Sequence, residues 1–150
     1  MKTRISIAGM MDVLEATGCA LIGQTEEIAP ADRRLYALRD VTGTIESLPL
    51  ICSSIMCKKI AEGVGALVLD VKAGRGAFLR DVDEARALAQ VMVDTGARAG
   101  VTTEALITNM DVPLGRAVGN ALELIECLDV LNGGGPPDLV ELCEILAARM

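Results

Sequence analysis

The sequence contains no histidine and no tryptophan, and it has only one tyrosine and one phenylalanine among 150 residues. Histidine is the commonest general base and the commonest transition-metal ligand in proteins. Any catalysis by this chain must therefore use lysine, arginine, carboxylate or hydroxyl groups. The scarcity of aromatic rings leaves almost nothing on which successive nucleic-acid bases could stack. A net charge of −7 and a pI near 4.6 also disfavour binding to a phosphate backbone, so we expect no nucleic-acid partner.

Long apolar runs are missing as well, although 51% of the residues are hydrophobic and the mean hydropathy is +0.43. No uninterrupted stretch reaches the ~18 apolar residues that indicate a membrane span. The first residues carry basic side chains, yet Asp12 and Glu15 interrupt the apolar segment that a signal peptide needs. We therefore expect a soluble, cytoplasmic protein without a membrane partner.

Cysteine is present in an odd number, and no two cysteines form a CxxC pair. All of them lie in apolar stretches of the sequence. This context predicts reduced thiols that act as small core residues, in preference to a redox or metal site. The five are Cys19, Cys52, Cys57, Cys127 and Cys143.

Short apolar or β-branched runs alternate with helical patterns along the chain, without repeats or linkers. The expected strands lie at 19–24, within 65–78 and within 101–110, and the expected helices lie at 30–40, 49–63, 81–100, 119–135 and 136–150. Strands that alternate with helices favour parallel pairing through helical crossovers. We therefore predict one α/β domain over residues 1–150, with a mostly parallel sheet and flanking helices. Ligands of such sheets bind beyond the carboxyl ends of the strands, where "DVKAGRGAF" and "TNMDVPLG" fall.

The segment "LPLICSSIMCKKIAEG", residues 48–63, combines apolar and polar groups on one predicted helix face. Ser54 and Lys58 are four residues apart, and Ile51 and Ile55 lie on the same side. Taken alone, paired lysines near a helix carboxyl end need no function, because the helix dipole favours them there. Together with Arg39, however, the hydroxyl and the ammonium could converge on one planar polar ligand.

Arg39, in the preceding predicted helix, has a simpler interpretation as a solvated charge at the helix end beside Asp40. The loop "GRGAF" at 74–78 superficially suggests a phosphate loop, but it completes neither GxGxxG nor GxxxxGK[ST], so an ordinary turn is simpler. A salt bridge is the simplest account of Asp70 and Lys72, which lie two apart on a strand. Glu126 on the helix after "PLGRAVGN" could serve a cation.

Three long segments carry a more specific signal, and they are "APADRRLYALRDVTGTIESLPLICSSIMCKKIAEG", "GALVLDVKAGRGAFLRDVDEARALAQVMV" and "TNMDVPLGRAVGNALELIE". In this order they resemble the central portion of pyrimidine-nucleoside phosphorylases, the family that contains thymidine phosphorylase. The resemblance covers about residues 17 to 143. It implies part of a catalytic domain of the nucleoside phosphorylase/phosphoribosyltransferase type.

The resemblance implies a pentosyltransferase of pyrimidine nucleoside salvage. Phosphate, the co-substrate, displaces the base from thymidine or uridine to give the free base and a pentose 1-phosphate, and no organic cofactor is involved. In the family, the arginine of "LYALRD" and the serine and first lysine of "SSIMCKK" hold the pyrimidine ring. These residues are Arg39, Ser54 and Lys58 here. Preplaced cations would stabilise the negative charge on the leaving base more than they stabilise the substrate.

The resemblance also implies walls for the base pocket, although core packing would explain the same residues. The matching positions are Tyr36, Ile45, Ile51, Ile55 and Phe78. Some family members bind a structural potassium ion through two backbone carbonyls of "PLGRAV" and a glutamate on the next helix. By position, these ligands are Leu114, Ala117 and Glu126, and hard oxygen ligands suit such an ion.

The sequence departs from the family in what it does not contain. The family's phosphate-binding segment, a glycine-rich motif with lysine, histidine and serines, is not found, and neither are the rest of the helical lobe and the carboxyl-terminal α+β portion. We therefore expect the base-binding half of the site, with weak or no activity of this chain alone. The absent parts normally supply most dimer contacts, so we expect an apolar exposed surface and a homo-oligomer. Cys57 replaces a serine or alanine, and Arg75 adds a charge to the "GxGAF" loop.

Two alternatives remain. The first is a non-catalytic remnant or assembly module that keeps the fold and binds, at most, a free base. The second is a relative that works on another base or acceptor, such as an AMP phosphorylase or an anthranilate phosphoribosyltransferase. The pattern of "RDVT" followed by "SSIMCKK" fits the anthranilate enzyme poorly.

Overall fold

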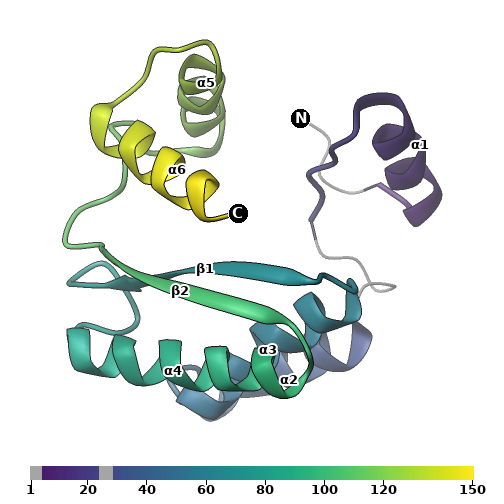
Figure 1. Cartoon of the computed structure of the whole chain (residues 1–150), viewed down its shortest axis with the longest axis vertical. Helices are drawn as coiled ribbons and strands as arrows, with labels where there is room; N and C mark the ends of the chain where they lie inside the picture. The colour runs from purple at the N-terminus through teal and green to yellow at the C-terminus, as the bar shows by residue number, and fades with distance from the viewer. Residues whose placement is uncertain (1–4, 24–28) are drawn as a thin grey trace. The chain divides into compact units, whose positions relative to one another are not determined.

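The structure is a computed structural model that describes residues 5–23 and 29–150 (Figure 1). The described helices and strands are, in chain order, α1 (Ile7–Thr17), α2 (Pro30–Thr42), α3 (Leu48–Ala61), β1 (Ala66–Ala73), α4 (Val82–Arg98), β2 (Thr102–Asn109), α5 (Asn120–Leu131) and α6 (Pro137–Arg149). The chain divides into two compact units, residues 1–45 and 46–150. The assignment of residues 1–150 to one domain stays a prediction.

The described part of the first unit contains α1 and α2. The sequence analysis did not predict α1, which begins where the N–H of Gly9 donates to Ser6 Oγ at 3.1 Å. Helix α2 is confirmed, with Pro30 in its first turn and Gly43 in the left-handed conformation (φ 64°) at its end. The strand predicted at 19–24 is wrong for residues 19–23, which form no strand, and residue 24 lies outside the described residues. A strand is stable only when it pairs with another, and this run has no such partner among the described residues.

The second unit is built on the predicted parallel sheet. Strands β1 and β2 pair in parallel, in a register that runs from Ala66 opposite Thr102 to Ala73 opposite Asn109. The predicted helices over 49–63, 81–100, 119–135 and 136–150 correspond to α3, α4, α5 and α6. The α/β fold class with a parallel sheet and flanking helices is therefore confirmed.

The core of this unit lies between the sheet and the helices α3 and α4, which cover one face of it (Figure 1). Side chains alternate between the two faces of a strand, and in β1 every second residue from Leu69 to Ala73 is buried. The buried hydrophobic side chains of this core are Cys52, Met56, Leu69, Val71, Ala73, Leu79, Ala85, Leu88, Ala89 and Met92. Asp70 and Lys72 consequently project from the opposite face of β1.

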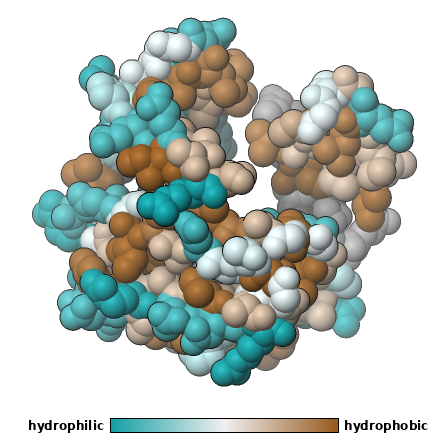
Figure 2. Space-filling view, in the orientation of Figure 1, coloured by the Kyte–Doolittle hydropathy of each residue, from teal (hydrophilic) through white to brown (hydrophobic). Residues whose placement is uncertain are grey.

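Helices α5 and α6 contain no buried residue. Figure 2 shows apolar side chains gathered on the surface over α5, and Leu122, Ile125, Leu128 and Leu131 of this helix are all more than half exposed. No described helix combines the length and the apolar character that a membrane crossing requires.

The prediction that all five cysteines are core residues is wrong. Only Cys52 is buried, and Cys19, Cys57, Cys127 and Cys143 are exposed free thiols. Cys127 and Cys143 lie on α5 and α6, where no face is covered by a core. Cys57 is five residues from Cys52 on α3, and this spacing turns it away from the buried stripe.

Candidate functional site

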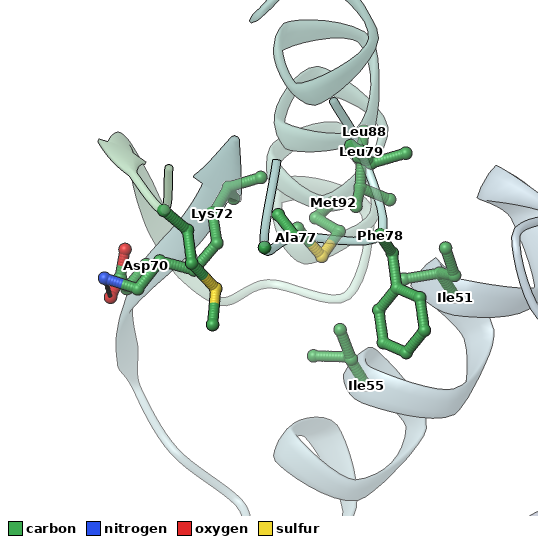
Figure 3. Close-up of a pocket in the computed structure, with 12 residues that line it drawn as sticks. Ile51, Ile55, Asp70, Lys72, Ala77, Phe78, Leu79, Leu88 and Met92 are labelled. Atoms are coloured by element: carbon green, nitrogen blue, oxygen red, sulfur yellow. Dashed lines mark ion pairs between the residues drawn. The ribbon is translucent and has the colours of Figure 1, made fainter. Parts of the chain in front are cut away.

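A pocket of about 540 Å³ in the second unit is lined by residues of α3, β1, α4 and the segments that follow the two strands (Figure 3). This volume falls within the range of about 300 to 1,000 Å³ that is typical of small-molecule sites. The pocket is mainly apolar, with one acidic and one basic side chain in its lining. The lining residues are Ile51, Ile55, Asp70, Val71, Lys72, Gly76, Ala77, Phe78, Leu79, Leu88, Met92 and Met110.

The loop after β1 brings Phe78 to the pocket because it is fastened to the turn after β2. The N–H of Arg75 donates to Asp111 Oδ1 at 3.0 Å, and the N–H of Gly76 donates to the Met110 carbonyl at 2.8 Å. Gly74 has φ 133°, and a Cβ on it would lie 2.7 Å from the backbone nitrogen of Asp111. This position therefore requires glycine.

The same hydrogen bonds support the interpretation of "GRGAF" as an ordinary turn. The N–H of Gly74 donates to the Leu79 carbonyl, and the N–H of Ala77 donates to the Gly74 carbonyl. With those of Arg75 and Gly76, all four amides from Gly74 to Ala77 are bonded within the protein. A phosphate loop needs such amides free to point at the anion.

Helix α3 presents the predicted polar pair beside this apolar pocket. Lys58 Nζ donates to Ser54 Oγ at 3.4 Å, which confirms that the two side chains share a face of the helix. One turn earlier, Ile51 and Ile55 of the same helix face Phe78 (Figure 3). Ser54 and Lys58 themselves are not among the lining residues, although Ser54 directly precedes the lining residue Ile55 on the same helix.

The second lysine of the motif has a separate, structural partner. Lys59 Nζ forms an ion pair with Glu62 at 3.1 Å, and its side chain is 40% exposed. Lysines in the last turn of a helix are favoured by the dipole. Lys59 therefore has a structural role at the end of α3, separate from that of Lys58.

Arg39, Tyr36 and Ile45 belong to the first unit. Arg39 is only 6% exposed, so the interpretation of this residue as a solvated charge at a helix end is wrong. Its guanidinium donates to the Thr44 carbonyl at 3.4 Å and to the Ile45 carbonyl, and its central carbon lies 5.2 Å from the centre of the Tyr36 ring. The arginine therefore holds the turn that ends α2, and a cation–π contact with Tyr36 adds to this packing.

Asp70 and Lys72 form the predicted salt bridge, with 2.8 Å between Nζ and Oδ2. Lys72 Nζ also donates to Thr108 Oγ1 on the adjacent strand at 2.9 Å, and the Thr108 hydroxyl donates to Asp70 Oδ1. We refer to Asp70, Lys72 and Thr108 as the Asp70 cluster. The register places Lys72 opposite Thr108, which explains why these three side chains meet.

Glu126 lies against the loop that the resemblance assigns to potassium. Its Oε1 accepts hydrogen bonds from the N–H groups of Arg116 at 3.0 Å and Ala117 at 3.1 Å. These two bonds hold the loop together with the Gly115 N–H, which donates to Asp138 Oδ2 at 3.3 Å. Glu126 Oε2 and the backbone carbonyls of Leu114 and Ala117 are hard oxygen donors of the type that suits potassium. Glu123 caps α5 by accepting the Gly119 N–H at 2.8 Å. Among the described residues, no group of three or more Cys, Asp or Glu side chains could hold a metal ion.

Comparison with known proteins defines the class of protein. Residues 4–150 match the family model described as glycosyl transferase family, a/b domain. The chain therefore belongs to this glycosyl transferase family, and the resemblance to pyrimidine-nucleoside phosphorylases is confirmed.

The particular relatives are nucleoside phosphorylases. The chain is 64% identical over 131 residues to a thymidine phosphorylase of Mycobacterium tuberculosis, an alignment that covers 87% of the chain and 31% of the relative. It is 54% identical over 140 residues to a pyrimidine-nucleoside phosphorylase of Geobacillus stearothermophilus, covering 93% of the chain and 32% of the relative. For a pyrimidine-nucleoside phosphorylase of Staphylococcus haemolyticus the identity is 53%, over 97% of the chain and 34% of the relative. The chain thus spans about a third of the length of these relatives.

The structure places residues in the pocket that the sequence analysis did not assign to a base-binding site. Asp70, Lys72 and Met110 line the pocket with the predicted Ile51, Ile55 and Phe78, because β1 and β2 end side by side. Ligands bind beyond the carboxyl ends of parallel strands, and this rule pointed to the segments "DVKAGRGAF" and "TNMDVPLG". It could not identify which of their side chains face the same space.

Proposed function

We propose that this chain carries the pyrimidine-binding part of a pyrimidine-nucleoside phosphorylase. The observation that carries the proposal is the Ser54–Lys58 pair, bonded at 3.4 Å beside the apolar pocket wall of Ile51 and Ile55. A flat base needs apolar surfaces along its faces and polar groups at its edge. The names of the relatives, thymidine phosphorylase and pyrimidine-nucleoside phosphorylase, support the choice of a pyrimidine.

In the proposed reaction a phosphate oxygen bonds to the anomeric carbon of the pentose while the glycosidic C–N bond breaks. The electron pair of that bond leaves with the base, so negative charge develops on the ring nitrogen and the carbonyl oxygens. The Lys58 ammonium would stabilise this charge, and the Ser54 hydroxyl would orient the ring. The resemblance assigns Arg39 to the same ring. Such stabilisation accelerates the reaction because it is greater in the transition state than in the substrate complex.

The proposal is tested by calorimetric titration of the purified chain with thymine and uracil. We expect Lys58→Ala to weaken base binding about tenfold or more, because a hydrogen bond to a charged group is lost. Lys59→Ala is the matched control, since this lysine pairs with Glu62, and it should leave the affinity unchanged. Equal effects of the two substitutions, or no binding of either base, would overturn the proposal.

A phosphate-dependent assay separates an enzyme from a non-catalytic module with the same fold. Release of thymine or uracil from the nucleoside is measured with and without phosphate, for the wild-type chain and for Lys58→Ala. Our proposal is that the chain alone is weakly active or inactive, because positioning of the nucleophile accounts for many orders of magnitude of rate. Robust phosphate-dependent release that Lys58→Ala abolishes would disprove that part of the proposal.

We also propose that the Leu114 and Ala117 carbonyls and Glu126 form part of a potassium site. Support comes from the position of Glu126, which already accepts two backbone N–H groups of this loop. Potassium should raise the melting temperature relative to equal concentrations of sodium or a large organic cation. Glu126→Gln should remove that difference, and a difference that survives the substitution would contradict the proposal.

We also propose that the protein self-associates through the apolar face of α5. We place the protein in the cytoplasm. Leu122, Ile125, Leu128 and Leu131 are exposed on this helix (Figure 2). Exposed apolar patches of this kind mark interaction sites. Sedimentation velocity should detect a dimer or larger species that Leu128→Glu dissociates, whereas a monodisperse wild-type monomer would refute self-association.

A further inference from the structure

The second unit has another pocket, of about 390 Å³, which we call the arginine pocket. It shares no lining residue with the proposed base pocket. Two of its lining side chains are arginines, although the net charge of the chain is −7. The lining residues are Ala73, Gly74, Arg80, Val82, Arg86, Ile107, Thr108, Asn109 and Asp111.

The charges in the arginine pocket leave a local excess of positive charge. Among the described residues that line it, Asp111 is the one carboxylate. Asp111 already accepts the backbone N–H of Arg75 at 3.0 Å, and the Arg75 guanidinium lies 3.8 Å from it. Arg75 therefore offsets much of the negative charge of Asp111. The two lining guanidiniums remain to attract an anion.

The hydrogen-bond donors of the two lining arginines are largely uncommitted. Arg80 makes no hydrogen bond or ion pair with any residue that the structure describes. Arg86 has one loose, exposed ion pair, in which Nε lies 3.8 Å from Asp83 Oδ1. A guanidinium carries five N–H donors in a planar fork, so both side chains have donors left for a ligand.

Asn109 adds a neutral donor to the same pocket. Its Oδ1 accepts the N–H of Asp111 at 2.8 Å, so the amide nitrogen is the end that remains for a ligand. The first amides of α4 are not available in the same way. Those of Asp83 and Glu84 donate to Asp81 Oδ1 at 2.7 and 3.3 Å. Side chains, and not the helix amides, would therefore hold an anion here.

The donors and walls of the arginine pocket fit a phosphate monoester best. A planar guanidinium pairs with two oxygens of one phosphate group, and two such cations match its double negative charge. Ala73, Val82 and Ile107 add apolar wall for an organic substituent. The pocket also lies at the carboxyl ends of the parallel strands, where ligands of such sheets bind.

We propose that the arginine pocket binds the phosphate group of a small organic phosphate monoester, with Arg80 and Arg86 as the main contacts. The inference does not rest on the proposed base binding, because the two pockets have no lining residue in common. It is also consistent with the bonded amides of residues 74–77, since the arginine side chains take the place of a phosphate loop.

The test is a titration of the whole chain with phenyl phosphate at about pH 7.5, where a phosphate monoester is largely dianionic. Backbone amide shifts of Gly74 and Asn109, recorded by nuclear magnetic resonance at constant ionic strength, report binding. Arg80→Ala and Arg86→Ala should each weaken binding about fivefold, the effect of losing an exposed charge pair. Arg98→Ala, at the other end of α4, is the matched control and should leave the affinity unchanged.

A fourth variant is expected to strengthen binding. Asp83→Asn releases Arg86 from its ion pair without changing a lining residue, so phenyl phosphate should bind about twofold more tightly. Melting temperatures of all variants identify any that fail to fold. A structural effect of the substitutions would lower stability, whereas it would not produce this gain in affinity.

Three ligands define the chemistry of the site. Inorganic phosphate should bind more weakly than phenyl phosphate, because it leaves the apolar wall uncovered, and benzoate should bind more weakly because it carries a single charge. Equal affinity for benzoate would overturn the assignment to a phosphate. Shifts that chloride reproduces, or equal losses in Arg80→Ala, Arg86→Ala and Arg98→Ala, would overturn the site itself. None of these results bears on thymine binding, so the proposed function is tested separately.

Discussion

The α3–β1–α4–β2 core and the α5–α6 hairpin belong to the same unit, yet they are stabilised in different ways. The core buries side chains of β1, α3 and α4, and also Val101 directly before β2. Among the buried residues, Met56 is 1% exposed and Ala85 is 0% exposed. Neither helix of the hairpin buries a residue. The free energy of folding must therefore come mainly from the core, because it scales with the apolar area removed from water.

Hydrogen bonds and ion pairs take the place of burial in the hairpin. Glu126 accepts the N–H groups of Arg116 and Ala117, and Arg149 at the end of α6 pairs with Glu104 of β2 at 3.4 Å. Exposed contacts of this kind contribute little each. The proposed pocket is lined by residues of this core, whereas the hairpin offers an apolar surface to a partner.

The largest expected effect contrasts one buried and one exposed apolar side chain. Met56→Ala should destabilise the chain by about 2 to 5 kcal/mol, because it leaves a cavity in the core. Leu131→Ala, at a residue that is 82% exposed, should change the free energy of unfolding by less than about 0.5 kcal/mol. Urea denaturation followed by circular dichroism measures both, and similar losses would invalidate the contrast between the regions.

The next effect concerns the loop that carries Phe78. In Gly74→Ala the new Cβ would lie 2.7 Å from the backbone nitrogen of Asp111, so the loop must move, at a cost of about 1 to 3 kcal/mol. Gly63→Ala is the matched control, because Gly63 also has a positive φ of 72° but no atom within 4 Å of the Cβ position. The control should show only the backbone strain of about 1 kcal/mol.

Base binding reports the displacement of this loop separately from stability. Gly74→Ala should weaken thymine binding, because Phe78 and Met110 line the proposed base pocket. Gly63→Ala should bind thymine like the wild-type chain. If the two variants lose equal stability and bind the base equally well, the close approach to Asp111 does not shape the pocket.

A smaller effect is expected where Glu126 holds the loop before α5. Glu126→Gln replaces a charged acceptor of two backbone N–H groups by a neutral one, which should cost about 1 kcal/mol. The amides of Arg116 and Ala117 should then exchange hydrogen faster, while core amides such as that of Val71 stay protected. Glu144→Gln, at an exposed glutamate of α6, is the control for the loss of one charge. Unchanged exchange at Arg116 and Ala117 would argue against this role of Glu126.

Local signals explain how much of the fold the sequence predicts. Helix α3 was bounded correctly by Pro49 near its start and Gly63 after its end, because proline and glycine act through their own backbone preferences. The strand predicted at 19–24 failed because pairing depends on a partner that a short window cannot contain. The prediction that Cys127 and Cys143 are buried is wrong for a related reason, because a helix can be amphipathic and still have no core beside it.

The sequence predicts the local placement of single site residues, but it does not predict which residues from distant segments meet in the pocket. The spacing of Ser54 and Lys58 places them on one helix face wherever the helix lies, so their hydrogen bond follows from the sequence. The presence of Asp70 and Met110 in one pocket depends on the register of two strands whose paired residues, such as Ala66 and Thr102, lie 36 positions apart along the chain, and no local pattern predicts it. The resemblance assigned Arg39 to the base but gave no sign that its guanidinium also holds the Thr44 and Ile45 carbonyls.

The smallest effect is expected at Arg75, the charge that this chain adds to the "GxGAF" loop. Its guanidinium lies 3.8 Å from Asp111 with the side chain 81% exposed, and such a pair contributes at most about 0.5 to 1 kcal/mol. Its backbone N–H, in contrast, donates to Asp111 Oδ1 at 3.0 Å and fastens the loop. Arg75→Ala keeps that N–H and should leave stability and thymine affinity nearly unchanged, whereas Arg75→Pro removes the donor and should weaken both. A large loss in Arg75→Ala, measured by the same denaturation and titration, would mean that the side chain and not the backbone holds the pocket wall in place.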